Sequence, residues 1–191
     1  MEHRRVAARR RMVRRYRDTP VDPEAIERIV AALLRGPTAG NSRGVAVVVV
    51  TDAGTRRSIA ALAGEPAYLD RGFDPWLSPA PVHLVICVEP QRYRERYREP
   101  DKDPSALAIP WWWVDGGAAM VLGALAAVDE SLAAGFLGGH RLQGVHELLG
   151  IPSGVEVLGV LTVGHPAPDR RTRSLGRSQR HEAVHRERWN G

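Results

Sequence analysis

Cysteine and lysine are almost missing from this chain of 191 residues, since each occurs only once, as Cys87 and Lys102. A single cysteine excludes a disulfide within the chain, so we expect a reducing compartment, the cytoplasm. Cys87 lies in the apolar run 82–88, and this setting predicts a core residue rather than a nucleophile. With 43% hydrophobic and 26% charged residues, the composition is typical of a globular protein, and we expect one domain over residues 1–191.

The chain also lacks the sequence signals of several protein classes. The longest weakly charged stretch, Gly116 to Val128, ends at Asp129 and falls short of the roughly 20 apolar residues of a membrane span. No apolar segment with a small-residue cleavage site follows the Arg-rich start, so we expect no signal peptide. The seven histidines form no HExxH motif or Cys/His set, which predicts no metal site. GxSxG, P-loop and GxGxxG motifs are missing too, which disfavours serine hydrolases, P-loop NTPases and Rossmann dehydrogenases.

Positive charge comes almost entirely from arginine, which makes up all but one of the 27 basic residues and crowds both ends of the chain. Together with the net charge of +5, such ends favour an anionic partner: nucleic acid, an acidic surface or a phosphorylated cofactor. Taken alone, the two arginine-rich ends are better explained as solvated charge runs. No RNP-like motif or recognition-helix pattern accompanies the arginines, which disfavours nucleic acid but leaves it as an alternative from a different functional class.

Hydrophobic periodicity predicts alternating helices and strands. The clearest helix begins with an acidic N-cap, Asp22, followed by Pro23 at the first helical position. The stretch from Gln91 to Arg98 is predicted to be a surface excursion. We expect strands at 45–50, 82–88 and 155–163, the first of them buried on both faces, and helices at 4–16, 23–34, 55–62, 114–133 and around 142–149.

Three segments carry potential chemistry. Arg10, Arg11 and Arg14 have a spacing that places two guanidinium groups on one helical face and a third beside them, which suits a phosphate. Residues 37–42, Pro-Thr-Ala-Gly-Asn-Ser, form a short polar connection whose groups could face a planar heterocycle. The third segment is Gly-Phe-Leu-Gly at 135–138, which is followed by Gly-Ile-Pro at 150–152 and Gly-His-Pro at 164–166.

In this order and at these separations, the segments resemble the FMN-dependent nitroreductase family. The family pattern is Arg-Arg-Ser-x-Arg-x-aromatic, Pro-Ser-x-x-Asn-x-Gln-Pro-Trp, Gly-Leu-Gly, Gly-Ile-Pro and a final Gly-x-Pro, and the resemblance covers about residues 10–189. It implies an α+β, three-layer fold in which helices flank a central mixed or antiparallel sheet. It also implies a homodimer with the long central helix at the subunit interface, exchanged terminal arms and two FMN sites.

The resemblance implies FMN as the cofactor and assigns contacts to it. The arginine segment and a basic residue near the C-terminus, Arg177 with Arg180 in reserve, would hold the phosphate. The loop at 37–41 would reach the flavin ring from the partner subunit, and backbone groups of 135–138 would approach the ring edge. The implied cofactor-binding residues are Arg10, Arg11, Met12, Arg14, Pro37, Thr38, Ala39, Gly40, Asn41, Gly135, Phe136, Leu137, Gly138 and Arg177.

The implied activity is reduction of an electron-poor small molecule by NADH or NADPH. The reduced nicotinamide and the acceptor would bind in turn over the flavin, so no side chain is expected to act as a catalytic acid or base. An FMN oxidase or desaturase acting on a small metabolite or peptide remains an alternative, as does a flavin-binding protein without turnover.

The chain departs from the family pattern at several positions. Met12 replaces the serine that would contact the phosphate, and Ser131 and Ala133 replace glycines of Gly-Leu-Gly. Arg43 stands where the family has glutamine. Together with the cluster Trp111 to Trp113, Arg43 is expected to reshape the acceptor pocket and to favour an acceptor that carries carboxylate or phosphate.

Overall fold

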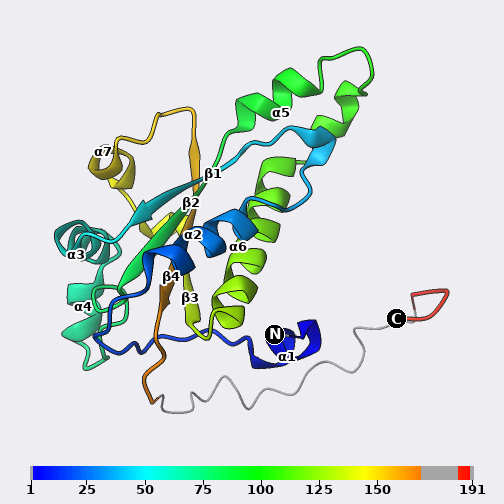
Figure 1. Cartoon of the computed structure of the whole chain (residues 1–191). Coiled ribbons are helices and arrows are strands. Elements are labelled where there is room, and N and C mark those ends of the chain that lie inside the picture. Colours follow the sequence, from blue (N-terminus) through cyan, green and yellow to red (C-terminus); the bar gives the residue numbers. More distant parts are fainter. Residues whose placement is uncertain (1, 169–184, 190–191) are drawn as a thin grey trace.

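The computed structural model describes residues 2–168 and 185–189. Helices and strands alternate along most of this range (Figure 1). The elements in chain order are α1 (His3–Arg9), α2 (Pro23–Leu33), η1 (Ala39–Asn41), β1 (Val45–Val50), α3 (Ala53–Leu62), α4 (Glu65–Leu69), β2 (Val82–Val88), α5 (Pro90–Arg96), η2 (Pro104–Ala108), α6 (Trp111–Asp129), β3 (Ala133–Gly138), η3 (Gly139–Arg141), α7 (Val145–Leu149) and β4 (Glu156–Gly164).

The four strands form one antiparallel sheet in the order β1-β2-β4-β3. The expected α+β class is confirmed, and the sheet has one strand more than we predicted, because the small residues of β3 carry no alternating hydrophobic pattern. β1 lies at an edge of the sheet. Its residues 45–48 are only half-buried and Val49 is 40% exposed, so the prediction that β1 is buried on both faces is wrong. The central strand β2 is buried along its whole length.

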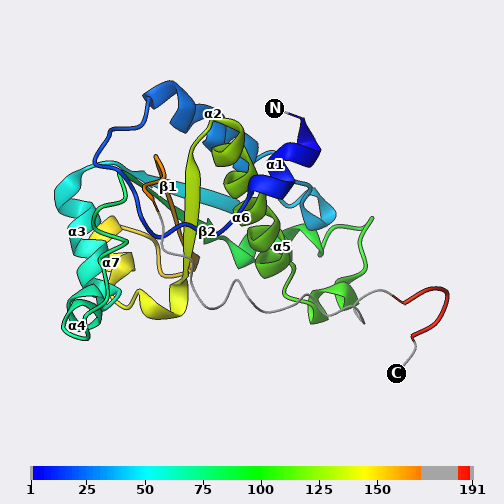
Figure 2. The same cartoon turned by 90° about the horizontal axis from the view of Figure 1, so that it is seen from below.

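Helices cover both faces of the sheet and complete the three expected layers (Figures 1 and 2). Side chains alternate along a strand, so Leu84 and Ile86 of β2 pack with α2 and α6, while Val85 and Cys87 pack with α3 and α7. Burial raises the pKa of the Cys87 thiol to about 11. The predicted core role of this cysteine is therefore confirmed.

α6 lies close to the sheet because glycine occurs where the helix crosses other elements. A Cβ atom at Gly116 would lie 2.9 Å from Val88, and one at Gly123 would lie 3.0 Å from both Leu161 and Leu33. The small residues on this side of α6 therefore serve packing within one chain. By length and composition alone α6 is also able to cross a membrane, but here one side of it packs against α2 and the sheet.

The first helix is shorter than the predicted span of residues 4–16, because α1 ends at Arg9. Beyond it, Met12 pairs with Ala134 of β3, and the backbone N–H of Val13 donates to the carbonyl oxygen of Ala134 at 2.8 Å. The Val13 N–H is thus bonded to β3 and is not available for the hydrogen bond that would continue the helix. The predicted helical face is wrong, and its three arginines lie on non-helical chain beside β3: Arg10, Arg11 and Arg14.

Three partly or fully buried side chains hold the loop between α4 and β2. The Glu65 carboxylate accepts hydrogen bonds at 2.8 Å from the backbone N–H groups of both Trp76 and Leu77. Arg56 donates to the carbonyl oxygen of Ala80, and His83 Nε2 donates to that of Leu77 at 2.9 Å. Because a carbonyl only accepts, this bond places the proton on Nε2. The Nδ1 atom of His83 is buried without a partner among the described residues.

We predict that stability falls below about pH 6.5 because of His83. Burial lowers its pKa to about 4, and nearby Arg56 acts in the same direction, while the Leu77 carbonyl and Glu65 oppose the shift. The unfolded chain binds the proton at a higher pH than the folded chain, so the contribution is complete above pH 6.5 and is lost as the pH falls towards 4. The loss is on the order of 3 kcal/mol.

Urea unfolding of the unmodified protein and His83→Gln across pH 4 to 7.5 measures this effect. Glutamine retains an amide donor for Leu77 but does not titrate in this range. The stability difference between the two proteins should shrink as the pH falls. A difference independent of pH would contradict the prediction.

Candidate functional site

The arginine segment, residues 10–14, is fixed to the sheet on both sides of Arg14. On one side lies the bond from Val13 to β3. On the other, the buried Tyr16 hydroxyl donates to the Val13 carbonyl oxygen at 3.0 Å and lies 2.7 Å from Thr162 Oγ1. Burial raises the pKa of Tyr16 above its ordinary value, so the hydroxyl stays protonated. The backbone that carries Arg14 is therefore anchored before any ligand binds.

Gly135 allows the arginine segment to approach β3 closely. A Cβ atom at this position would lie 2.2 Å from the Val13 carbonyl oxygen and 3.1 Å from the Tyr16 hydroxyl, so a larger residue would displace the segment. The structure thus brings the arginine segment and the start of the 135–138 segment together. The remaining residues of that segment lie along β3 and are half-buried: Phe136, Leu137 and Gly138.

The loop before β2 contacts the arginine segment and the adjoining Arg15 through two side chains that sequence reasoning missed. The Arg14 guanidinium lies 5.5 Å from the ring centre of Trp76, within the range of a cation–π contact. Asp74 forms an ion pair with Arg15. Glu65 holds this loop through the N–H of Trp76. The positions of the Arg14 and Arg15 side chains therefore depend on a loop that follows them by about sixty residues in the sequence.

The second predicted segment, the loop at 37–41, is held by Asp115 of α6. Asp115 is only 7% exposed, and its Oδ2 accepts hydrogen bonds from the Ala39 N–H at 2.9 Å and the Tyr93 hydroxyl at 2.7 Å. Burial, followed by the bond to Asp115, raises the pKa of Tyr93 above its ordinary value. Arg96 donates to the Gly40 carbonyl oxygen at 2.8 Å. The loop is therefore tied to both α5 and α6.

These ties hold a loop with an unfavourable backbone. Gly40, Asn41 and Arg43 have φ angles of 62°, 58° and 50°, and a non-glycine residue in this region costs on the order of 1 kcal/mol or more. The Arg43 N–H donates to Thr38 Oγ1, and Arg43 Nε donates to Asn41 Oδ1, each at 3.1 Å. The bonds orient the Arg43 guanidinium and occupy one acceptor of Asn41.

We call the hydrogen bonds from the Ala39 N–H and the Tyr93 hydroxyl to Asp115 the clamp on the 37–41 loop. One sequence signal pointed towards this clamp without identifying it. Asp115 is the only charged residue between Trp111 and Val128, and a charge inside an apolar helix normally has a polar partner. The partner Tyr93 lies in the segment that we expected to be a surface excursion. That segment does project as an arm built from α5 and η2 (Figure 1), but Tyr93, which belongs to α5, is fully buried.

The two predicted segments lie at opposite ends of α6. Asp115, near the start of the helix, holds the 37–41 loop. Arg11, from the arginine segment, lines a cavity of about 240 Å³ together with Val128 and Ser131 at the other end. A helix rises 1.5 Å per residue, so about 20 Å separates Asp115 from Val128. One chain does not bring the two segments together. The last predicted contact, Arg177, lies outside the described residues.

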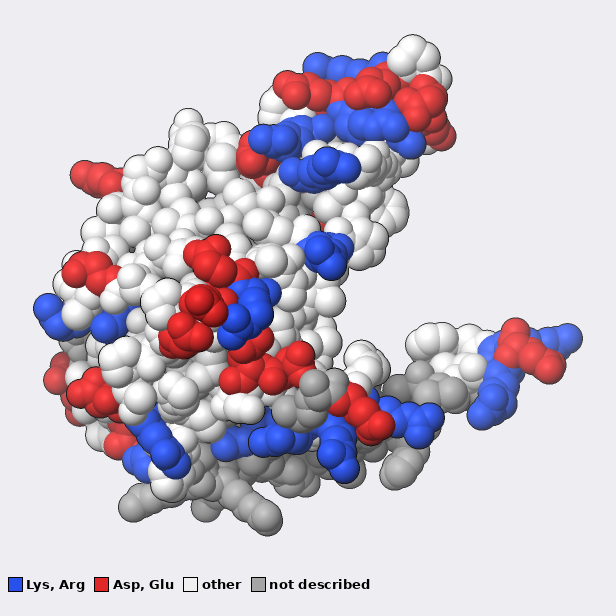
Figure 3. Space-filling model, in the orientation of Figure 1, with Lys and Arg blue, Asp and Glu red and all other residues white. Residues whose placement is uncertain are grey.

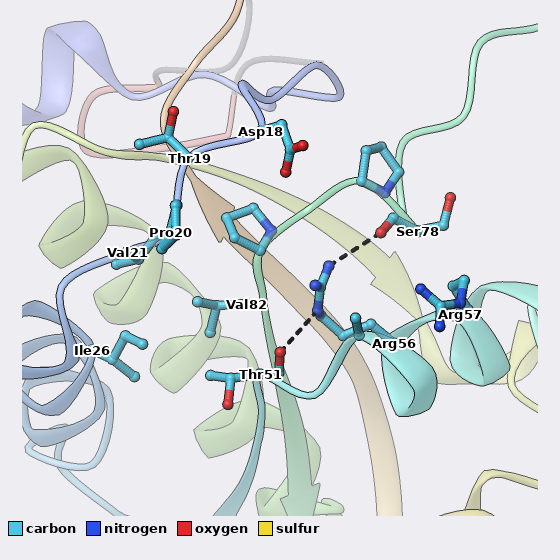
Figure 4. A pocket seen from close by; sticks show the side chains of 13 residues that line it. Asp18, Thr19, Pro20, Val21, Ile26, Thr51, Arg56, Arg57, Ser78 and Val82 are labelled. Carbon is cyan, nitrogen blue, oxygen red and sulfur yellow. Dashed lines mark hydrogen bonds between the residues drawn. The ribbon is translucent and has the colours of Figure 1, made fainter.

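Another cavity, of about 400 Å³, lies between the start of α2 and the start of α3 (Figure 4). None of the implied cofactor-binding residues lines it. Arg56 points into this region, but it donates to carbonyl oxygens of Thr51, Ser78 and Ala80. Its guanidinium therefore supports the loop before β2, and we assign no ligand to this cavity.

Comparison with protein-family models gives a match to the model described as Nitroreductase family over residues 7–165. The chain is 30% identical over 166 residues to an FMN reductase [NAD(P)H] of Bacillus subtilis; the match covers 82% of this chain and 63% of the relative. It is 29% identical over 177 residues to an NADPH-flavin oxidoreductase of Vibrio harveyi, covering 92% and 69%. The chain thus spans less than two thirds of the Bacillus protein.

A solved structure is similar over nearly the whole chain. The NADPH:FMN oxidoreductase from Vibrio harveyi complexed with NAD+ superposes with a TM-score of 0.77 and 27% sequence identity. The superposition covers 99% of this chain and 78% of that one.

We predict that Tyr93→Phe weakens the clamp on the 37–41 loop. Loss of a buried hydroxyl that donates to a carboxylate should lower the free energy of unfolding by about 1.5 to 3 kcal/mol. Amide exchange at Ala39 should accelerate as well. Tyr97→Phe is the matched control, because the Tyr97 ring packs near Gly40 and its hydroxyl has no partner within the described part of the chain. Equal effects of the two changes would argue against the clamp.

Proposed function

Because the chain belongs to the nitroreductase family, we propose that it is an FMN-dependent oxidoreductase in which NADH or NADPH provides electrons for an electron-poor small molecule. The relatives named FMN reductase and NADPH-flavin oxidoreductase support both the flavin and the nicotinamide. Bound FMN supplies the two-electron transfer between donor and acceptor. The observation that carries the proposal is the arginine segment, which is anchored to β3 over Gly135.

The residues of this segment fit a phosphate. Arg10, Arg11 and Arg14 are exposed along non-helical chain, and arginine pairs well with phosphate oxygens through its planar fork of donors. Within the described ranges, Arg14 contacts the Trp76 ring and no carboxylate, so its N–H groups are available there to an anion. Met12 offers only its backbone where the family has a hydroxyl. Arg177 is the further phosphate contact in this proposal.

The proposed enzyme is a homodimer, since one copy does not unite the two segments. The arginine segment and residues 135–138 of one copy bind the phosphate and the ring edge. The other copy places its 37–41 loop over the ring: Pro37, Thr38, Ala39, Gly40 and Asn41. About 20 Å of α6 separates the segments within a chain, and a twofold arrangement lets each α6 serve two sites.

The outward face of α6 supports this assembly. Val114 and Val121, two turns apart, are 52% and 44% exposed, and Trp113 is 39% exposed. A Cβ atom at Gly117 would have no neighbour within 4 Å, so this side of the helix has no packing partner among the residues that the structure describes. Figure 3 shows charged residues crowded on the projecting arm, a mixed cluster of both signs on the body, and a mostly uncharged surface directly below the arm. A second copy would bury this apolar surface.

A cytoplasmic location completes the proposal. The single cysteine is a buried thiol in β2, as is usual for proteins of a reducing compartment. No side chain is assigned as an acid or base. The chain's own contribution is to bind and orient the cofactor and its substrates and to exclude water from them. It does so through loops that are anchored before the cofactor enters.

We predict that the purified protein is yellow and holds about one FMN per subunit. Arg14→Ala should weaken FMN binding roughly 10- to 150-fold, because loss of a charged hydrogen bond costs about 1.5 to 3 kcal/mol. Its effect on the unfolding of the flavin-free protein should be small. The control is Arg57→Ala, which removes an exposed arginine on α3 away from the implied flavin residues. A colourless protein that takes up no FMN on reconstitution would refute the proposal.

The direction of electron flow is tested on the same preparation. NADH or NADPH added without oxygen should bleach the flavin absorbance, and an electron-poor acceptor should restore it. Bleaching only by another metabolite or a peptide would instead identify an oxidase or desaturase.

We predict that Val121→Glu dissociates the dimer and reduces FMN retention. In a twofold assembly each copy would bring an unpaired carboxylate to the apolar interface, where burial of charge is strongly unfavourable. Sedimentation should show a monomer with a native circular dichroism spectrum. Val49→Glu is the matched control, because Val49 is similarly exposed, at 40%, on the edge strand β1. A stable, flavin-loaded monomer of the unmodified protein would contradict this prediction.

A further inference from the structure

A cavity of about 480 Å³ lies where α2 runs into the 37–41 loop and β1. Two arginines line it, Arg35 and Arg43, together with the polar side chains of Thr38 and Asn41. We call it the Arg35/Arg43 pocket. No Asp or Glu belongs to the described residues that line it, so its local charge is positive.

Arg43, which lines this pocket, is held in place by contacts within its own loop. Its φ of 50° is uncommon for a residue with a side chain, and such backbone persists only where surrounding contacts impose it. Thr38 and Asn41 supply these contacts through the Arg43 N–H and Nε. The bond at Nε leaves the two Nη groups of the guanidinium, which form the end of the fork that pairs with a carboxylate or phosphate.

The rest of the pocket wall is apolar. Leu34 is 47% exposed, although leucine is normally buried, and Pro37 and Val45 lie on the same wall. A ligand that satisfies both kinds of surface has a flat or apolar body and an anionic group at one end. An aromatic carboxylate or phosphate has this form.

We propose that the Arg35/Arg43 pocket binds the anionic group of a molecule that exchanges electrons at the flavin site, and so selects substrates that carry carboxylate or phosphate. This inference rests on the proposed function, in which the 37–41 loop reaches a flavin. The anionic group belongs either to the acceptor or to the nicotinamide donor, and kinetic measurements separate these two sources.

The acceptor arm compares 4-nitrobenzoate with 4-nitrobenzamide, which share a ring and differ in charge. Arg43→Gln and Arg35→Gln should each raise KM for 4-nitrobenzoate roughly tenfold or more, the loss expected for a charged hydrogen bond. KM for 4-nitrobenzamide should stay within about twofold, and FMN content by absorbance should be unchanged. Arg43→Lys keeps the charge without the fork and should give an intermediate value. Arg57→Gln serves as the control arginine.

The donor arm compares NADPH with NADH, which differ by one phosphate. If the arginines bind that phosphate, the Gln variants should lose efficiency with NADPH only, while the ratio between the two nitro compounds stays as in the unmodified protein. This result supports an anion site and assigns it to the donor. Unchanged ratios in both arms, with normal FMN content, would overturn the inference.

A binding measurement that needs no turnover separates this inference from the proposed function. Calorimetric titration with benzoate should show binding to the unmodified protein and at least tenfold weaker binding to Arg43→Gln, with benzamide as the neutral probe. If the protein holds no FMN, the proposed function fails and the benzoate titration still decides the pocket. Equal binding of benzoate to both proteins, or none to either, would overturn the anion site.

Discussion

The close packing of α6 on the sheet is the constraint from which the arrangement of the site follows. A Cβ atom at Gly116 or Gly123 would press on the side chain of Val88 or Leu161, so glycine at these positions lets the helix lie close to β2 and β4. The start of α6 then carries Asp115 to the 37–41 loop, and its end leads directly into β3, which holds the arginine segment. The length of one helix thus sets the distance between the two groups of residues that the flavin is proposed to contact.

This constraint makes the outward side of α6 as important as the inward side. The inward glycines are explained by packing within one chain, so they give no information about a second copy. Val114 and Val121 bear on the question of a second copy, because they lie on the opposite side of α6 and remain exposed. A membrane would also cover an apolar face, but a face of valines beside Gly117 on a helix already packed against the sheet suits another protein surface better. Gly116 and Gly123 thus belong to the core of one chain.

The sequence predicted the elements whose signals are local. Asp22 and Pro23 mark the start of α2, and the apolar runs mark β1, β2 and β4 to within a residue or two. It did not predict β3, since Ala133 to Gly138 become a strand only through pairing with β4. The helix predicted to reach Tyr16 fails for a related reason, because Val13 bonds to the same strand. The motif residues of the candidate site were recognisable, whereas their supports, Trp76 and Asp115 above all, depend on contacts between distant segments.

Those supports share a physical feature that suits a site for an anion. Glu65 and Asp115 are buried carboxylates whose partners are backbone N–H groups and a tyrosine hydroxyl rather than arginines. Each fixes a loop without neutralising a nearby guanidinium. Arg14 rests on an aromatic ring, and Arg43 is bound through Nε to an amide oxygen. If these arginines paired with carboxylates instead, a phosphate would have to displace an ion pair before binding. The loops are therefore rigid for reasons independent of the charges that they present, which is the arrangement that preorganised recognition of an anion requires.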